Sequence, residues 1–285
     1  MSVETQMNHH DQSLSSADLN RLRELVYQQA GINLGPDKRV MLELRLRPRL
    51  RHLRLSTFSD YCKLLHDPRQ RRQELVHFLD AVTTNKTDFF REPGHFEFLT
   101  QKALPATGVG YTRPLFVWCS ASSTGEEPYT LAMVLQQYAE AHPGFRFRIL
   151  ATDLSTKVLE KANLAIYPED VVAPIPIDLR RKYFMRSTDR EDKRFRVTRE
   201  LRNLVEFRQL NLMDKDYGVA EPVDMLFCRN VLIYFDRPTQ EAILRKLTRC
   251  IVPGGFLYLG HSETIHGLDL PLSPVAPALY RKLHA

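Results

Sequence analysis

The stretch CSASSTGEEPYTLA, residues 119–132, holds the first residues whose types and spacing could do chemistry. It follows the apolar run PLFVW and leads into a helical pattern, which is where a nucleotide-binding fold places its phosphate loop. A phosphate loop needs glycines and a lysine, whereas this turn has one glycine and two acids, Glu126 and Glu127, which would repel a phosphate. The same carboxylates would attract a ligand that carries an ammonium or a sulfonium group. An equally good interpretation of this stretch alone is that the two acids complement the helix dipole.

A second strand-like run, FRILATD, ends in an acid, Asp153. At the carboxyl edge of a doubly wound sheet, a carboxylate can accept hydrogen bonds from the hydroxyls of a ribose. Taken alone, Asp153 would more simply cap the helix pattern that follows it. Together with the acidic turn, Asp153 favours the ribose interpretation. A ligand that carries a ribose, an ammonium and a sulfonium is S-adenosylmethionine.

These residues need a scaffold of alternating strands and helices, and such a pattern begins at Leu115. The expected strands lie at residues 115–121, 147–153, 223–230 and 255–262, with helical patterns between them at 127–141, 155–167 and 237–251. This alternation predicts an α/β fold with a doubly wound, mostly parallel sheet. Short alternating strands around a charged turn predict a small antiparallel β insert at about residues 180–208.

The N-terminal part has a different pattern. We expect a disordered tail over residues 1–17 and a small helical domain over 18–84, with helices near 16–31, 36–55, 56–67 and 71–85. Leucines 42, 46, 50 and 53 form one stripe of the second helix, with Arg47, Arg51 and Arg54 on one flank and Arg45 and Arg49 on the other. Pro48 interrupts this pattern, so the helix is expected to kink or to begin at Arg47.

Composition restricts the class of protein. The chain has 285 residues and a net charge of +6, and residues 19–54 alone hold nine basic residues against three acids. A face with one sign of charge predicts an acidic partner. No apolar run is long enough for a membrane span or a signal peptide, and the four cysteines form no C-x-x-C pair. We therefore expect a cytoplasmic protein with reduced cysteines, no metal and no membrane insertion.

Six blocks then carry a resemblance that covers nearly the whole chain: TTNKTDFFRE, SASSTGEEPY, ATDLSTKVLEKA, LNL, FCRNVLIYFD and GGFLYLGHSE. In order and spacing they resemble the chemotaxis receptor methyltransferases, the CheR family. The resemblance implies a class I S-adenosylmethionine-dependent methyltransferase domain over residues 85–285, which methylates receptor glutamates to γ-methyl esters and releases S-adenosylhomocysteine. The cofactor residues it implies are Asn85, Thr87, Arg91, Glu127, Asp153, Asn211, Leu212, Arg229 and Asn230.

Within this set, Glu127 would bind the methionyl ammonium, Asp153 the ribose and Asn211 the adenine. A glutamate carboxylate is already ionised at neutral pH, so it needs alignment and exclusion of water rather than a general base. Arg91 and Tyr234 are the candidates for holding it. The alternatives are a structural salt bridge for Arg91 and a packed core aromatic for Tyr234.

The resemblance also implies partners. Arg45, Arg47, Arg49, Arg51 and Arg54 would dock the acidic methylation region of receptor helices, and the β insert would bind a receptor C-terminal tail peptide or act as a plain spacer. We expect a monomer. One competing hypothesis is a nucleic acid methyltransferase, but no aromatic residue interleaves the arginines from 45 to 54, so bases would have no stacking platform and we expect no nucleic acid partner. Another is a non-catalytic adaptor that senses the cofactor.

Overall fold

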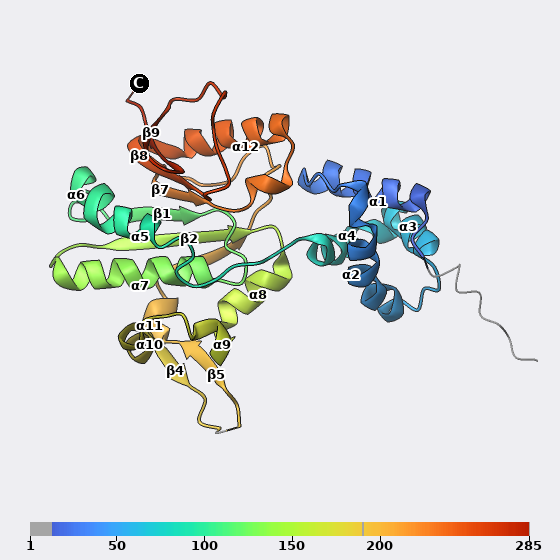
Figure 1. Ribbon diagram of the computed structural model, residues 1–285, viewed down its shortest axis with the longest axis horizontal. Coiled ribbons are helices and arrows are strands. Elements are labelled where there is room, and N and C mark those ends of the chain that lie inside the picture. The colour runs from blue at the N-terminus through green and yellow to red at the C-terminus, as the bar shows by residue number, and fades with distance from the viewer. Residues whose placement is uncertain (1–12, 190, 285) are drawn as a thin grey trace, which may run out of the picture. The chain divides into compact units, whose positions relative to one another are not determined.

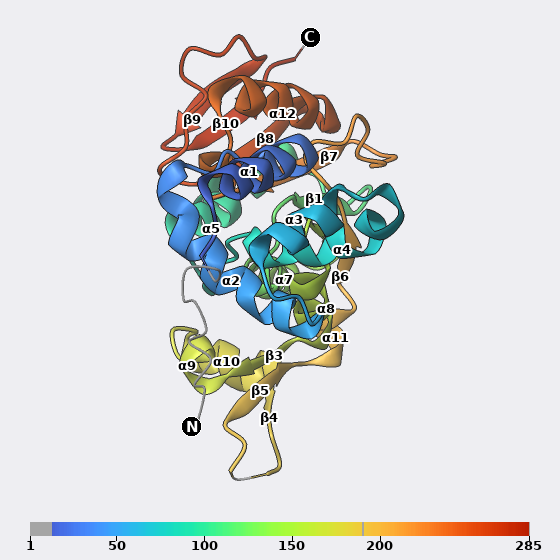
Figure 2. The same ribbon diagram turned by 90° about the vertical axis from the view of Figure 1, so that its right-hand side faces the viewer.

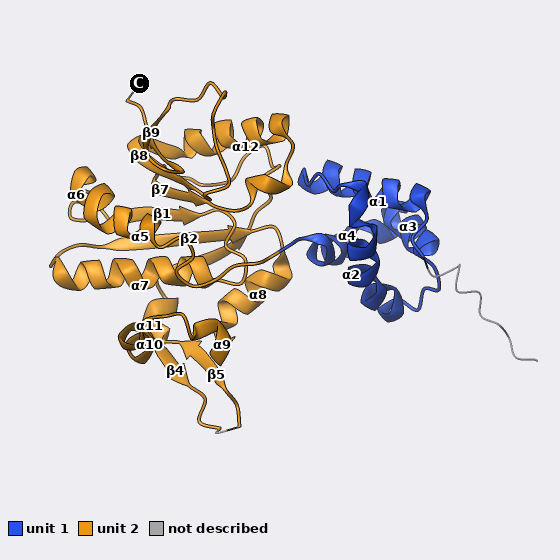
Figure 3. Ribbon diagram, viewed as in Figure 1, with its two compact units in different colours: residues 1–84 blue, residues 85–285 orange. Residues whose placement is uncertain are grey.

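A computed structural model describes residues 13–189 and 191–284. The chain divides into two compact units, residues 1–84 and residues 85–285 (Figures 1 and 3). Most of the predicted tail lies outside the described residues, and its described end differs from the prediction. Leu14 is buried, and helix α1 begins at Ser16 because the Ser15 hydroxyl accepts a hydrogen bond from the Asp18 amide and caps the helix.

The first unit contains four α-helices within its described residues. They are α1 (Ser16–Ala30), α2 (Arg39–His52), α3 (Phe58–His66) and α4 (Pro68–Val82), with a short 3-10 turn, η2 (Pro36–Lys38), before α2. The predicted end of α1 is confirmed, because Gly31 ends the helix with a left-handed φ of 70°. Leu42, Leu46 and Leu50 are buried on one side of α2, as the leucine stripe predicts.

Pro48 lies inside α2, which continues from Arg39 to His52 and therefore does not begin at Arg47. A proline there removes the amide that would bond the carbonyl of Leu44. Pro48 and Leu44 are both exposed, so water can replace the missing hydrogen bond.

The second unit is built on a sheet of seven strands with the order β6-β2-β1-β7-β8-β10-β9. The strands are β1 (Leu115–Cys119), β2 (Phe147–Asp153), β6 (Val205–Gln209), β7 (Val223–Cys228), β8 (Ile251–Leu259), β9 (Leu272–Ala276) and β10 (Leu279–Lys282). The first five in spatial order pair in parallel, and the β8–β10 and β10–β9 pairs are antiparallel. The central strands β1 and β7 are buried along their whole length, which suits the apolar sequence of β1 and of most of β7. The charged residue of β7, Asp224, is paired with Arg113.

Helices cover both faces of this sheet, with α7 (Glu126–Ala141) on one face and α12 (Arg237–Cys250) on the other (Figures 1 and 2). Helix α8 (Thr156–Leu164) follows β2, and the 3-10 turn η4 (Leu232–Tyr234) follows β7. Before β1, the chain forms α5 (Gly94–Phe98), the π-helical segment η3 (Leu99–Ala103) and α6 (Leu104–Thr107). The doubly wound α/β prediction is confirmed.

The β insert is a separate antiparallel sheet of three strands with the order β3-β5-β4. Its strands are β3 (Ile166–Pro168), β4 (Phe184–Arg186) and β5 (Arg194–Val197), and the short helices α9 (Glu169–Val172), α10 (Ile177–Tyr183) and α11 (Arg199–Arg202) lie beside them (Figure 1). The insert thus begins earlier than predicted. Residues 205–208 belong to β6, which pairs in parallel with β2, because the apolar Val205 and Phe207 continue the main sheet.

None of the helices within residues 13–189 and 191–284 combines the length and the apolar character that a bilayer crossing requires.

Candidate functional site

The acidic turn connects the carboxyl end of β1 to the start of α7, as the sequence predicts. Gly125 precedes the helix with a φ of 101°, and a Cβ placed on it would lie 2.7 Å from the Tyr167 hydroxyl. Only glycine fits this position. Ser123, in the same turn, also has a positive φ, 49°.

The two acids of the turn have different surroundings. Glu126 is buried and accepts a hydrogen bond from the Thr124 hydroxyl, and burial raises the pKa of its carboxyl. Glu127 accepts a hydrogen bond from Arg229 at 2.5 Å and one from the Cys119 thiol at 3.0 Å. Glu127 therefore does more than complement the helix dipole, because it forms an ion pair at the sheet edge.

Asp153 ends β2 and holds the acidic turn in place. One carboxylate oxygen accepts from the Ser123 amide at 2.8 Å and the other from the Ser155 amide at 3.0 Å. The Ser155 hydroxyl, rather than Asp153, caps α8. The capping interpretation of Asp153 is therefore replaced by a role in joining β2 to the turn after β1. The Ser123 hydroxyl also donates to the carbonyl of Asn85, which brings a third predicted residue to this turn.

Arg229 follows β7 and is the buried cation of the site, with 5% of its surface exposed. It donates to Glu127, to a carboxylate oxygen of Glu92 at 3.0 Å and to the backbone carbonyl of Arg91 at 2.5 Å. Burial would lower the pKa of this guanidinium, but Glu127 and Glu92 more than offset that effect and raise it. Three segments that are far apart in sequence therefore meet at one charged group.

The loop after Arg229 is fixed by a residue that sequence reasoning did not select. Glu263 is buried and accepts hydrogen bonds from the amides of Asn230, Leu232 and Gly260 at 2.9, 2.7 and 2.6 Å. Asn230 has a φ of 57°, and a Cβ on Gly260 would lie 2.3 Å from its side-chain nitrogen. Tyr234 ends η4 a few residues later and is only half-buried, so it is not a packed core aromatic.

Arg91 lies on the segment that precedes α5. Its guanidinium donates to the carbonyl of Lys86 at 3.3 Å. Within residues 13–189 and 191–284, no carboxylate lies within ion-pair distance of Arg91, which argues against the structural salt bridge. Thr87, on the same segment, is half-buried.

Asn211 and Leu212 follow β6, next to the end of β2. The Leu210 amide donates to the carbonyl of Asp153, so the two strand ends are joined. The side-chain oxygen of Asn211 accepts from the Met213 amide, and Leu212 is buried. Thus the predicted cofactor residues come from the carboxyl ends of β1, β2, β6 and β7 and from the segment at residues 85–91.

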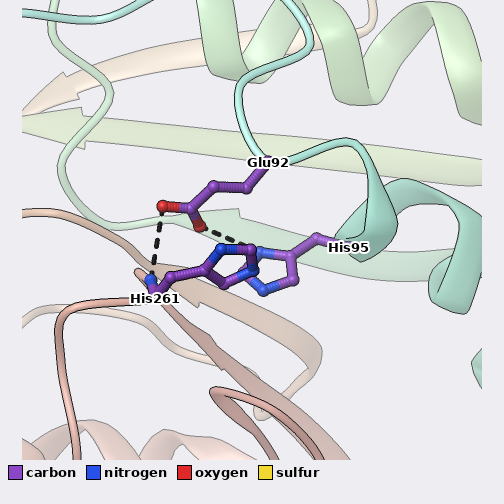
Figure 4. A group of neighbouring side chains, drawn as sticks. All are labelled: Glu92, His95 and His261. Carbon is purple, nitrogen blue, oxygen red and sulfur yellow. Dashed lines mark hydrogen bonds and ion pairs between the residues drawn. The ribbon is translucent and has the colours of Figure 1, made fainter.

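Glu92, His95 and His261 form a cluster whose donor atoms all lie within 4.8 Å of one another (Figure 4). His95 is 2% exposed, and burial, aided by the nearby Arg229, lowers its pKa to about 4, so it is neutral at physiological pH. The Glu92 carboxylate faces Arg229 as well as the two histidines. A divalent ion bound here would lie beside a buried guanidinium, which opposes metal binding. The geometry favours a junction between loops over a metal site.

The arginines of α2 divide into two groups. Arg49 forms two hydrogen bonds with the buried Glu74, at 2.7 and 2.6 Å, and Arg45 donates to the carbonyls of Val82 and Thr83. Arg51 and Arg54 are exposed, and Arg47 is half-buried, 3.9 Å from Glu43. Two of the five predicted docking residues therefore have internal structural roles.

Glu92 and Glu263 are the two residues of this site that the prediction missed. Glu92 directly follows the selected Arg91, and Glu263 ends the block GGFLYLGHSE. Their contacts are mainly to backbone groups and to Arg229. A sequence does not show which backbone amides a carboxylate will meet, so the only signal for these two acids was their place inside blocks that carry the resemblance.

Comparison with known proteins gives two family matches. Residues 17–83 match the family described as CheR methyltransferase, all-alpha domain, and residues 85–276 match CheR methyltransferase, SAM binding domain. The chain is 42% identical to a chemotaxis protein methyltransferase of Escherichia coli strain K12 over 90% of this chain and 87% of that one. It is 43% identical to one from Salmonella typhimurium (90% and 86% covered) and 37% identical to one from Borreliella burgdorferi (95% of each).

Proposed function

The chain belongs to the CheR methyltransferase family, and on that premise we propose that it methylates glutamate side chains of chemoreceptors with S-adenosylmethionine, forming glutamyl methyl esters. The observation that carries the proposal is the convergence of the implied residues at one sheet edge. Hydrogen bonds link Asn85 to Asp153 through Ser123, and ion pairs link Glu127 to Arg229. This edge is where open α/β sheets bind ligands.

The charges of this edge fit the proposed cofactor. Arg229 and Glu127 place a cation and an anion side by side, which complements the carboxylate and the ammonium of a methionyl group. The ammonium would bind Glu127 and the methionyl carboxylate would bind Arg229, while these two side chains keep their hydrogen bond to each other. Asp153, Asn85 and Thr87 would bind on the ribose side, and Asn211 with the buried Leu212 would contact the adenine.

The chemistry needs orientation more than proton transfer. S-adenosylmethionine supplies an electrophilic methyl group, and an ionised glutamate can accept it without a base. Arg91 would hold the acceptor carboxylate by a charge-assisted hydrogen bond, and Tyr234 would align it from the loop that Glu263 fixes. Both side chains are half-buried and so can reach a substrate.

The receptor surface that we propose is narrower than the predicted one. Arg51 on α2 and Arg54 in the turn after this helix are exposed, and Arg47 on α2 is half-buried, whereas Arg45 and Arg49 serve the first unit internally. We therefore assign docking of acidic receptor helices to Arg47, Arg51 and Arg54.

The test is the chemical nature of the product. Receptor cytoplasmic fragments are incubated with the enzyme and methyl-labelled cofactor and then treated with mild alkali. A methyl ester releases volatile labelled methanol, whereas an N-methyl group does not, and changing the acceptor glutamate to glutamine should stop labelling. The variant Asp153→Ala should label at least tenfold more weakly at limiting cofactor, because a charge-assisted hydrogen bond contributes about 1.5–3 kcal/mol. Base-stable label, or label in nucleic acid, would contradict the proposal.

A further inference from the structure

We propose that Glu92 is a positioning residue of the methyl-transfer site, and that it acts by holding Arg91 in a strained turn. The inference rests on the proposed function, because it concerns the same site. What points to Glu92 is the backbone around Arg91 together with the partners of the Glu92 carboxylate.

The backbone on both sides of Arg91 is in an unusual conformation. Phe90 and Glu92 each have a φ of 56°, in the left-handed region that residues other than glycine rarely adopt, bulky ones least of all. Such a turn persists only when surrounding contacts determine it. On one side, the Phe90 amide donates to the buried Thr130 hydroxyl at 3.2 Å.

On the other side, Glu92 supplies the contacts. One of its carboxylate oxygens accepts from Arg229 at 3.0 Å, and the other accepts from the Asn230 side chain at 3.4 Å. The latter oxygen also accepts from the His261 amide at 3.3 Å (Figure 4). The carbonyl of Arg91 accepts from the same Arg229 nitrogen. Glu92 thus fastens the turn to the loops that follow β7 and β8.

The electrostatics of Glu92 suit a positioning role. Burial alone would raise the pKa of its carboxyl, but the adjacent Arg229 more than offsets this and keeps the pKa below its ordinary value. The charge of Glu92 is therefore present at neutral pH, so its carboxylate can accept the hydrogen bonds that hold the turn. Arg229 shares its single charge between Glu92 and Glu127.

The consequence concerns the direction of the Arg91 side chain. Within residues 13–189 and 191–284, its guanidinium donates one hydrogen bond, to the carbonyl of Lys86, so the turn sets the direction of the charge. A displacement of about 1 Å can lower a rate on the order of a hundredfold when a reaction depends on alignment. Without Glu92 the turn can relax toward ordinary φ values, and Arg91 would move with it.

The experiment is a double-mutant cycle on kcat for methylation of a receptor fragment, with Glu92→Ala, Arg91→Ala and the combined variant. We expect Glu92→Ala to lower kcat at least tenfold in the wild-type background and to have no further effect when Arg91 is already alanine. Additive losses would show that Glu92 does not act through Arg91 and would overturn the proposal. Glu97→Ala, at an exposed glutamate of α5, is the matched control and should leave kcat unchanged.

A second pair of variants separates positioning from stability. Glu92→Gly accepts the positive φ without strain, so it should unfold at a higher temperature than Glu92→Ala while remaining equally slow. Recovery of both stability and kcat in Glu92→Gly would indicate a merely structural role. Glu92→Gln keeps the shape of the side chain and should be more stable than Glu92→Ala, with a kcat between those of wild type and Glu92→Ala. If Arg91→Ala leaves kcat unchanged, the positioning proposal fails, and base-labile labelling by the wild type still decides the proposed function.

Discussion

Two regions of this molecule contain arginines to which we assign a function, and these arginines differ in burial. In the second unit, Arg229 is almost fully buried and donates to two carboxylates and a backbone carbonyl. In the first unit, Arg51 extends from α2 into solvent, and Arg54 is exposed in the turn that follows this helix. Arg49, on α2, resembles Arg229 because it is paired with a buried acid. It donates two hydrogen bonds to Glu74, whose carboxylate also accepts one from the Tyr61 hydroxyl.

The burial of an arginine and the acids beside it indicate its role. A buried guanidinium requires paired acids, since an unpaired buried charge is costly, so its function is to organise the groups around it. An exposed guanidinium in a face of one sign contributes little to folding and is available for an acidic partner. Helix α2 holds both kinds within a few residues. The predictions below test that separation.

The largest effect is expected when the exposed face is reversed. Changing Arg47, Arg51 and Arg54 together to glutamate should abolish receptor methylation, because an acidic receptor surface would then meet like charges. Affinity for S-adenosylhomocysteine, measured by calorimetry, should stay unchanged, since the cofactor residues belong to the second unit. Methylation by the wild-type enzyme should also weaken as salt increases.

The matched control for this reversal uses Lys63, Arg69 and Arg72, which are exposed on α3 and α4 and carry the same total charge. Their reversal should leave most of the methylation activity intact. Equal losses in the two triple variants would mean that net charge, rather than the α2 face, controls the reaction.

A smaller but still severe effect is expected from the buried arginine. Arg229→Met leaves Glu92 and Glu127 without their cation, and breaking a buried ion pair in this way costs about 3–5 kcal/mol. Urea unfolding can be followed by the fluorescence of Trp118, the single tryptophan, which is buried in β1 and so reports on the second unit. Arg54→Met should change stability by no more than about 0.5 kcal/mol. Similar stability losses for the two substitutions would remove the distinction between buried and exposed arginines.

Sequence patterns predicted the scaffold well, for physical reasons visible in particular residues. Gly31 ends α1 near the expected residue, and the apolar residues of β1 and β7 are buried throughout. The pattern failed to show where the chain leaves the insert and returns to the main sheet. Residues 205–208 alternate like the insert strands, yet β6 pairs with β2, and pairing between distant segments leaves no mark in the local alternation.

The site was predicted by residue type but not by contact. Arg229 and Asn230 were selected, whereas Glu92, which accepts from Arg229, and Glu263, which accepts from the Asn230 amide, were not. The division of the α2 arginines was also invisible, because Arg49 pairs with Glu74 from another helix. Charge and helical spacing give the direction of a side chain on its own helix, and they do not show which neighbouring element supplies a carboxylate.

The smallest effect that we predict concerns His95, the neutral member of the junction around Arg229. Burial first, and then the charge of Arg229, lower its pKa to about 4, although Glu92 acts in the opposite direction and His261 assists the lowering. The unfolded chain therefore binds more protons than the folded one between about pH 4 and pH 6.5, and stability must fall as pH decreases through that window.

The variant His95→Gln should lose this slope, which we expect to be on the order of 2 kcal/mol across the window. Urea unfolding of the second unit at several pH values, followed by Trp118 fluorescence, measures it. His66→Gln on α3, an exposed histidine bonded to the carbonyl of Cys62, is the control and should keep the wild-type slope. An unchanged slope in His95→Gln would show that the buried arginine does not exclude a second positive charge from its surroundings, and the contrast with the solvent-exposed arginines of α2 would lose its electrostatic basis.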